Sequence, residues 1–287
     1  MGSTPSLFHA CVVIKSLLNF FISVGADIDS QIGFYTPLTA ACHDGHLQIV
    51  EILLETGSKI NKTNTHGETP LYTACFEGHH SLVNCLIDKE ADINKQNKYS
   101  RSPLYASCLM GHETIVSLLI DKGANIFQCT DLLIAATLGG HDKIVKILIS
   151  VDCCLNNVDM KGKTALFIAC EEGYTKIVEF LIDNNADIYK VDSDGRTPLH
   201  AACCLGNNDI VSMLIGKDSD LDMIDVDLET PLHKACRKGS IGVIQKLLAF
   251  GADINKTNRD VHTPAHIAKT EGSIVNTRIL KALEKNL

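Results

Sequence analysis

The strongest constraint in this sequence is a repeat with a period of 33 residues. Cysteines mark the period in two runs, which are Cys42, Cys75 and Cys108, then Cys170, Cys203 and Cys236. A Thr-Pro-Leu tripeptide or a close variant keeps the same step, and a glycine follows nine residues after each start. The starts are Thr36, Thr69, Ser102, Thr164, Thr197, Thr230 and Thr263. A period of about 20 to 50 residues is typical of stacked repeat architectures, so each copy is expected to form one structural unit.

The number of copies follows from one irregular gap. Ser102 and Thr164 are 62 residues apart, four residues short of two periods, so one copy between them has lost four residues. That copy starts at Asp131, and the shortened loop, the fourth finger, is residues 127–130. A weaker copy opens the chain at Thr4. The sequence therefore predicts a single domain over residues 1–287, whose first and last copies act as caps and whose roughly nine repeats start near residues 4, 36, 69, 102, 131, 164, 197, 230 and 263.

Each copy contains the start and stop signals of two short helices. Thr69 can cap a helix whose first turn contains Pro70, and Gly78 can end it in the left-handed conformation. The apolar residues between them fall on one helical face, and a second stripe predicts a longer helix: Leu82, Val83, Leu86 and Ile87. Two short helices cannot bury their apolar faces alone, so neighbouring copies must stack on one another. The predicted fold class is all-α.

These motifs resemble the ankyrin repeat. The resemblance is clearest in the Thr-Pro-Leu-His segment at residues 197–200 and in the Gly-Ala-Asp-Ile-Asn segment at residues 251–255, and it covers residues 4–287. It implies a solenoid of helix-turn-helix repeats with short β-hairpin finger loops. It also implies a non-catalytic surface that binds another protein through its fingers and the first helices, on the concave side.

The cysteines are expected to be structural. Seven of them share one position of the first helix: Cys11, Cys42, Cys75, Cys108, Cys170, Cys203 and Cys236. Stacked helices lie about 8–10 Å apart, too far for disulfides, and no two cysteines have the C-x-x-C spacing common in zinc sites. We therefore expect small apolar fillers, with no disulfide and no metal. Cys204, one step past this column, should lie at the surface as a free thiol.

The histidines also follow the period, which argues against catalysis. Seven of the twelve occupy either the Gly-His turn (His46, His79, His112 and His141) or the position after Thr-Pro-Leu or its variant (His200, His233 and His266), where a structural hydrogen bond is expected. No nucleophile elbow, H-E-x-x-H motif or glycine-rich phosphate loop is present. We expect no enzymatic activity and no cofactor.

Charge and hydropathy exclude two other classes. Acidic residues outnumber basic ones 34 to 26, giving a net charge of -8, whereas a generic nucleic-acid binder needs a basic surplus. No apolar run reaches the roughly 20 residues of a membrane-spanning helix. We expect an intracellular protein, cytoplasmic or nuclear, that is monomeric and binds neither nucleic acid nor membrane.

The resemblance further implies asparaginyl hydroxylation at Asn94 and Asn255. Each of these residues ends a Leu-x5-Asp-Ile-Asn pattern. The same pattern is the repeat consensus, so unmodified asparagine is the alternative.

The partner surface is expected at positions that the repeat leaves free, just before each Thr-Pro and just before each Gly-His. In the N-terminal half these residues and their neighbours are large and mostly apolar: Phe34, Tyr35, Phe76, Tyr99, Arg101, Leu109, Met110 and Leu138. In the C-terminal half they are charged, and we expect a polar rim there: Lys163, Glu171, Glu172, Arg196, Glu229, Arg237 and Lys238. Exposed apolar patches with aromatic and Arg anchors typically mark interfaces. The alternative is that Phe34 and Tyr35 pack under the first loop and the others are scattered exposed residues.

The predicted function is a protein–protein interaction module. The alternative is a regulatory or substrate-recruiting ankyrin domain excised from a larger enzyme, channel or ubiquitin-ligase adaptor. A purely structural spacer would have no partner.

Overall fold

The computed structural model describes residues 15–17, 19–127 and 131–270. Contacts between Cα atoms divide the chain into two compact units, Met1–Leu132 and Leu133–Leu287, and each is described here by itself. The predicted first copy near residue 4, the polar part of the last copy and most of the shortened finger at residues 127–130 lie outside the described residues.

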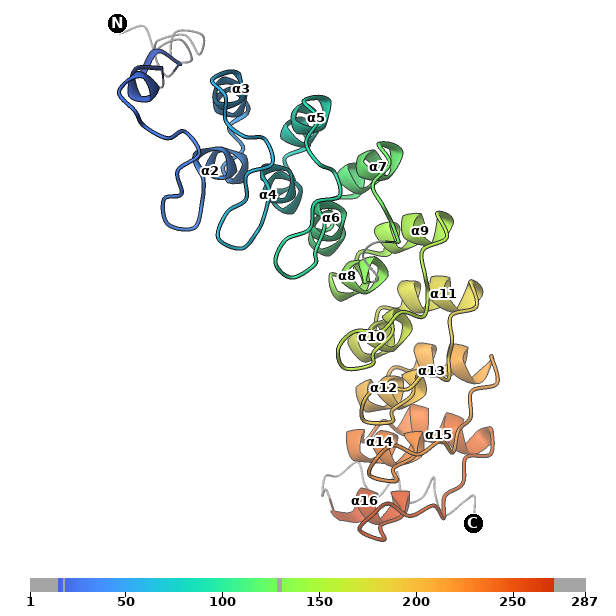
Figure 1. The fold of residues 1–287 in the computed structure, drawn as a ribbon. Coiled ribbons are helices and arrows are strands. Elements are labelled where there is room, and N and C mark those ends of the chain that lie inside the picture. The colour runs from blue at the N-terminus through green and yellow to red at the C-terminus, as the bar shows by residue number, and fades with distance from the viewer. Residues whose placement is uncertain (1–14, 18, 128–130, 271–287) are drawn as a thin grey trace, which may run out of the picture. The chain divides into compact units, whose positions relative to one another are not determined.

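The first unit is a stack of helix pairs. The first helix of each pair, the inner helix, packs on the inner helix of the next pair, and the outer helices form a second row (Figure 1). Residues 15–17 and 19–23 are helical and precede the first pair. The pairs are α2 (Pro37–His43) with α3 (Leu47–Glu55), α4 (Pro70–Glu77) with α5 (His80–Asp88), and α6 (Pro103–Met110) with α7 (Glu113–Asp121).

The second unit repeats this arrangement. Inner helices α10, α12, α14 and α16 contact one another in order, as do outer helices α9, α11, α13 and α15. The helices are α8 (Leu132–Leu138), which begins at the last residue of the first unit, α9 (Asp142–Ser150), α10 (Ala165–Glu172), α11 (Thr175–Asp183), α12 (Pro198–Leu205), α13 (Asn208–Ile215), α14 (Pro231–Lys238), α15 (Ile241–Ala249) and α16 (Pro264–Thr270). The predicted all-α repeat solenoid is confirmed, and the helices begin where the period predicts.

The helix ends have the predicted chemistry. The Thr69 hydroxyl accepts a hydrogen bond from the Tyr72 N–H at 3.1 Å, which satisfies one free donor of the first turn of α4. Gly78 ends that helix with φ +82°, a conformation in which any residue with a Cβ is strained. Gly111, Gly173, Gly206 and Gly239 end their helices in the same way.

The cysteine column lies in the core. Its six described members are almost completely buried: Cys42, Cys75, Cys108, Cys170, Cys203 and Cys236. Burial raises the pKa of Cys75 and of Cys236 to about 12. The prediction of buried filler is confirmed for these six, whereas Cys11 lies outside the described residues.

Six of the described finger loops are closed by an Asn or Asp side chain that the sequence analysis did not single out. Asn64 Oδ1 accepts the N–H groups of His66 and Glu68, and the Asn64 N–H donates to the Glu68 carbonyl at 2.9 Å. The same arrangement recurs at Asn97, Asp159, Asp192, Asp225 and Asn258. Among the described residues, the one isolated β-bridge joins Ile32 and Tyr35. The β-hairpin character of the fingers and the count of nine repeats stay predictions.

No helix within the described residues combines the length and the apolar character that crossing a bilayer requires.

Candidate functional site

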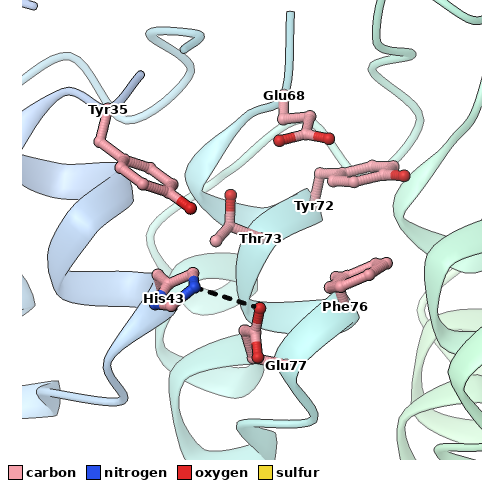
Figure 2. A pocket seen from close by; sticks show the side chains of 7 residues that line it. All are labelled: Tyr35, His43, Glu68, Tyr72, Thr73, Phe76 and Glu77. Atoms are coloured by element: carbon pink, nitrogen blue, oxygen red, sulfur yellow. Dashed lines mark ion pairs between the residues drawn. The ribbon is translucent and has the colours of Figure 1, made fainter. Parts of the chain in front are cut away.

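The inner-helix surface of the first unit is hollowed between α2 and α4. The hollow measures about 210 Å³ and is lined by Tyr35, His43, Glu68, Tyr72, Thr73, Phe76 and Glu77. In Figure 2, Tyr35 and His43 lie on one side, Tyr72 and Phe76 on the other, and Thr73 between them. The carboxylates of Glu68 and Glu77 lie at the two ends of this arrangement. We call this hollow the Tyr72 pocket.

Aromatic rings form the two walls of the Tyr72 pocket. On one side the rings of Tyr72 and Phe76 are nearly parallel, with centroids 6.5 Å apart. On the other side Tyr35 meets His43 edge-on at 5.3 Å. The structure thus brings together two residues predicted from the sequence, Tyr35 and Phe76. The sequence analysis missed Tyr72, although the aromatic residues at the third position of an inner helix were a visible signal.

The polar groups of the Tyr72 pocket are mainly acidic. Glu68 accepts a hydrogen bond from the Asn64 amide at 2.7 Å, and Glu77 lies 3.6 Å from His43 Nε2. Burial raises the pKa of Tyr72, and the Glu68 carboxylate raises it further, while the charge of Arg101 acts in the opposite direction. No Lys or Arg is among the residues that line the pocket.

The other predicted anchors of the first unit lie around this surface. Phe34 is 64% exposed and stacks on His66, with ring centroids 5.7 Å apart. Tyr99 is also 64% exposed, and the Arg101 guanidinium lies 5.8 Å from its ring centroid. At the end of α6, Met110 is exposed and Leu109 is half-buried.

Leu138, the remaining predicted apolar anchor, is exposed at the end of α8. It belongs to the second unit, unlike the other apolar anchors.

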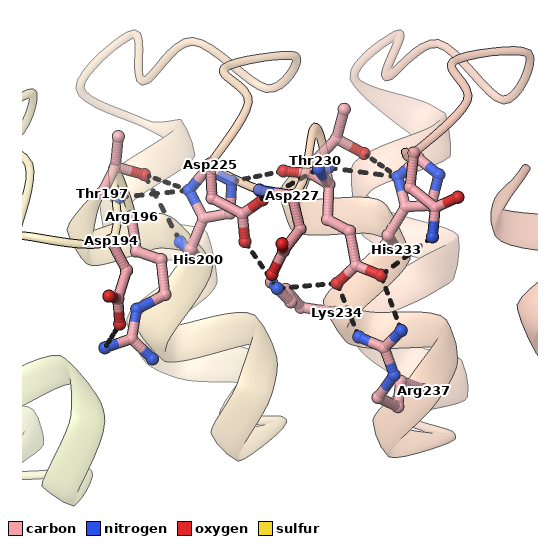
Figure 3. Close-up of polar contacts among 12 residues, drawn as sticks. Asp194, Arg196, Thr197, His200, Asp225, Asp227, Thr230, His233, Lys234 and Arg237 are labelled. Carbon is pink, nitrogen blue, oxygen red and sulfur yellow. Dashed lines mark hydrogen bonds and ion pairs between the residues drawn. The ribbon is translucent and has the colours of Figure 1, made fainter. Parts of the chain in front are cut away.

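One predicted rim residue is instead the centre of a buried ion-pair cluster. Glu229 is only 3% exposed, and both of its carboxylate oxygens accept hydrogen bonds from Arg237, at 2.5 and 2.6 Å. Lys234 lies 2.6 Å from both Glu229 and Asp225 (Figure 3). The prediction that Glu229 lies on the surface was therefore wrong, because Lys234 and Arg237, both in the following helix α14, enclose its carboxylate.

The electrostatics of this cluster follow from burial and pairing. Burial alone would raise the pKa of Glu229, but hydrogen bonds from Arg237, Lys234 and Asn258 outweigh it and lower the pKa to about 2. Burial likewise opposes the charge of Lys234, yet the carboxylates of Asp225 and Glu229 raise its pKa. Glu229 and Lys234 are therefore both charged at neutral pH.

The other predicted rim residues divide into paired and exposed groups. Glu171 pairs with Lys163 at 2.5 Å, and Arg196 pairs with Asp192 at 2.6 Å and Asp194 at 3.2 Å. Glu172 and Lys238 are exposed, and no ion pair among the described residues involves them. Intramolecular pairing therefore holds four of these six residues: Lys163, Glu171, Arg196 and Arg237.

Four of the histidines, His79, His112, His200 and His233, have the predicted structural roles. In the Gly-His turns, the Nε2 atoms of His79 and His112 each lie 3.0 Å from a carbonyl of the preceding repeat. In α12, His200 Nδ1 accepts the Thr197 N–H at 3.1 Å, and its Nε2 donates to the Glu229 carbonyl at 3.0 Å (Figure 3). His233 repeats this arrangement in α14. Both ring nitrogens are occupied, so neither His200 nor His233 is available as a base.

Apolar residues at the finger tips of the second unit were missed by the sequence analysis. Met160, Val226, Leu228 and Val261 are exposed on these loops. Leu228 and Val261 have φ near +61°, at the finger position that Gly67, Gly162 and Gly195 occupy in other repeats. Leu228 and Val261 could have been noticed in the sequence, because each replaces a glycine that recurs at this position in other repeats.

The remaining candidate residues are Cys204 and two asparagines. Cys204 is an exposed free thiol, as predicted; its partial burial raises its pKa, against the opposing charges of Lys234, Arg196 and Arg237. Asn94 is half-buried and its Oδ1 accepts the Asn125 N–H at 2.8 Å, whereas Asn255 is exposed. Hydroxylation at Asn94 and Asn255 stays a prediction. In the part of the chain that the structure describes, no three His, Cys, Asp or Glu side chains are arranged to hold a metal ion.

Stacked helix pairs joined by closed finger loops place this protein among the helical-repeat solenoids. A family model described as ankyrin repeats (3 copies) matches residues 7–97, 57–129, 127–192 and 185–258. The chain belongs to the ankyrin-repeat family, whose members are generally protein–protein interaction modules without catalytic activity. The chain is also similar to human ankyrin repeat and KH domain-containing protein 1, at 35% identity over 66 residues. That match covers 23% of this chain and spans 2% of the length of the human protein.

Proposed function

We propose that this chain is a non-catalytic module that binds a segment or domain of another protein on the inner-helix and finger surface of its first unit. The observation that carries the proposal is the exposure of large side chains at positions the repeat leaves free. Phe34, Tyr99 and Met110 together expose aromatic and thioether surface beside the Tyr72 pocket. Exposed patches of this kind, with a concave feature among them, are typical of interaction sites.

The arrangement of the anchors supports binding rather than simple exposure. Phe34 and Tyr99 are each held by a neighbouring group, His66 and Arg101, so part of their side-chain freedom is already lost before a partner arrives. A pre-ordered anchor loses less conformational entropy on binding, which favours affinity per contact. Arg101 can also pair with a carboxylate or stack on a ring of the partner.

The exposed charges of the second unit have a different role in this proposal. Glu172 and Lys238 are exposed and can steer a charged partner during encounter. Arg237 belongs to the buried Glu229 cluster, so reversing its charge would leave a buried carboxylate without its main partner. We expect that change to act on stability, and changes at Glu172 and Lys238 to act on the association rate and its salt dependence. A monomeric protein of the cytosol or nucleus that binds neither nucleic acid nor membrane is part of the same proposal.

A second candidate function is a regulatory or recruiting ankyrin domain within a longer protein. The similarity to the human ankyrin repeat and KH domain-containing protein 1 favours this candidate. The matched segment makes up 2% of that protein, which also contains a KH domain. The size of the full-length gene product distinguishes the two candidates.

The test uses the chain as bait in a lysate of its source, followed by mass spectrometry and by affinity measurements with the purified partner. Tyr99→Ala truncates an exposed anchor, and Tyr189→Ala is the matched control, because Tyr189 is an exposed tyrosine of the second unit. We expect Tyr99→Ala or Phe76→Ala to weaken binding by about 2 kcal/mol or more, as at a hot spot. Tyr189→Ala should bind like the wild type.

Measurements at two salt concentrations separate anchors from steering charges. The loss of affinity caused by Tyr99→Ala should persist at high salt. Charge reversal at Glu172 or Lys238 should change the affinity mainly at low salt. If the aromatic variants bind normally while the charge reversals abolish binding, the partner surface lies in the second unit and the proposal is wrong.

A further inference from the structure

In two other repeats of this chain, a Lys or Arg side chain lies over the aromatic ring at the third position of the inner helix. Tyr72, Tyr105 and Phe167 occupy this position in α4, α6 and α10. The Arg101 guanidinium lies over Tyr105, 4.9 Å from the ring centroid. Lys163 and Arg196 lie over Phe167, at 5.3 and 5.6 Å. In both cases a cation from a finger end covers the aromatic face, an arrangement stabilised by the ring quadrupole.

The Tyr72 ring lacks this internal cation. The finger residue that corresponds to Arg101 and Lys163 is Glu68, and within the described residues no Lys or Arg lies over the Tyr72 ring. The hollow of about 210 Å³ lies against this ring, with carboxylates at Glu68 and Glu77. This repeat thus has the aromatic residue, Tyr72, but carries the acidic Glu68 at the position where the repeats with Tyr105 and Phe167 carry a cation.

The size and polarity of the pocket define its occupant. Pockets that hold whole drug-sized molecules have volumes of about 300–1,000 Å³, so this one suits a single side chain. An apolar side chain would desolvate two carboxylates without pairing them, which is costly. A cation in the hollow would instead have aromatic side chains on two sides and a carboxylate at either end, as these residues are placed in Figure 2.

We propose that the Tyr72 pocket receives a lysine or arginine side chain of the partner protein. Its charged head lies between Tyr35 and the Tyr72–Phe76 pair and donates hydrogen bonds to Glu77 and Glu68. This inference rests on the proposed function, since it names one side chain of the segment that the first unit binds. It extends the surface predicted from the sequence by Tyr72, Glu68 and Glu77.

The direct test needs no partner. N-acetylarginine amide and N-acetyllysine amide are titrated into the whole chain at neutral pH and low salt, and the amide NMR signals of Thr73, Phe76 and Glu77 are followed. N-acetylcitrulline amide, which has the shape of the arginine probe without its charge, is the ligand control. We expect saturable shifts with the two cationic probes and none with citrulline.

The repeat supplies a matched variant pair. Glu77→Gln removes a pocket carboxylate, and Glu172→Gln makes the same change at the equivalent position of α10, outside the residues that line the Tyr72 pocket. We expect Glu77→Gln to weaken binding of the cationic probes by about threefold or more and Glu172→Gln to leave it unchanged. Phe76→Leu, which removes a ring but keeps an apolar side chain, should weaken binding about fivefold.

Three results would overturn the assignment. They are the absence of shifts with both cationic probes, equal shifts with citrulline, and equal weakening by Glu77→Gln and Glu172→Gln. The proposed function fails separately. A partner that is lost with Tyr99→Ala but binds Glu77→Gln with wild-type affinity contradicts the pocket assignment alone, whereas a partner unaffected by either change contradicts both.

Discussion

At the scale of single residues, some finger loops lack the glycine that other repeats have at the finger tip. Gly67, Gly162 and Gly195 have positive φ at the finger tip, a conformation that glycine adopts without steric cost. Leu228 and Val261 adopt the same conformation with side chains that clash with their own backbone there. Ser100 adopts this conformation at the same position with a smaller side chain, so Leu228 and Val261 are the finger positions where one substitution should relieve the most strain.

Val261→Gly is therefore expected to stabilise the protein. A β-branched residue in the left-handed region costs about 1–2 kcal/mol, while glycine adds about 0.5–1 kcal/mol of backbone entropy to the unfolded chain. We expect a net gain of about 0.5–1 kcal/mol, measured as the midpoint of urea unfolding followed in the second unit. The Val261 side chain is 76% exposed, so little packing is lost.

Gly195→Ala is the reciprocal control. Its φ is +75°, and an added Cβ would lie 3.3 Å from the backbone nitrogen of Val226, so it should destabilise. If Val261→Gly also destabilises, the Val261 side chain makes a contribution that its exposed position does not explain.

The sequence predicted residue roles well where the period determines them. The capping threonines, the left-handed glycines and the buried cysteines follow from spacing, because each depends on neighbours within the same repeat. The placement of Glu229 was wrong for the opposite reason. Its burial depends on Lys234 and Arg237 reaching it from the following helix and on Asn258 of the next finger. The Tyr72 pocket was incompletely predicted because its two walls come from different repeats.

At the scale of helices, the side chain that completes the N-terminal cap of α2 differs from the one that completes the caps of α12 and α14. In α2 the Thr39 hydroxyl accepts the Thr36 N–H at 2.8 Å, and in α12 and α14 the Nδ1 atoms of His200 and His233 do the same. Threonine does not titrate in the acidic range, whereas imidazole does. Burial lowers the pKa of both histidines below the ordinary value of 6.5.

The lowered pKa values predict a loss of stability in mild acid. An imidazole whose pKa is lower in the folded state contributes stability that is fully present above pH 6.5 and is lost as the pH falls toward the folded pKa. Glu229, lowered from 4.5 to about 2, contributes stability that is lost only below pH 4.5. The interval from pH 6.5 to 4.5 therefore reports on histidines.

Neighbouring charges modify this shift without reversing it. For His200, the carboxylates of Asp225 and Asp192 favour the charged imidazole, and the charge of Lys234 opposes it. For His233, the carboxylate of Glu229 favours the charged imidazole, and the charges of Arg237 and Lys234 oppose it.

The double variant His200→Thr/His233→Thr isolates the histidine contribution. Threonine can keep the cap, as Thr39 does, but it loses the bond to the next finger's carbonyl. We expect a lower melting temperature at neutral pH and a smaller further decrease between pH 6.5 and 4.5 than in the wild type. His80→Thr removes an exposed imidazole from the first unit and should keep the wild-type pH dependence. A double variant with the full wild-type decrease would show that other groups cause the acid sensitivity.

At the scale of the whole molecule, the fold follows from a repeated core rather than from any single site. One leucine column of the outer helices is completely buried in both units: Leu86, Leu119, Leu148, Leu181, Leu214 and Leu247. The sequence predicted this stack because its period is regular. It did not predict the division into two units at Leu132, which lies where the shortened finger interrupts the period.

Repeat proteins are stabilised mainly by contacts between neighbouring repeats, so damage to the core should remain local. Leu119→Ala in α7 and Leu214→Ala in α13 make the same cavity at the same repeat position in different units. Each should cost roughly 2–5 kcal/mol. Hydrogen exchange read by mass spectrometry should show lost protection in residues 70–121 for Leu119→Ala and in residues 165–249 for Leu214→Ala.

Cys108→Ala is the control for a mild core change, since it removes one sulfur atom from the same unit as Leu119→Ala. We expect it to leave the protection of both units close to that of the wild type. Local loss from each leucine variant means that stability is determined unit by unit, so a partner bound to the first unit should increase protection there and leave residues 165–249 unchanged. Uniform loss across both units from either leucine variant would instead mean that the chain unfolds as one cooperative body.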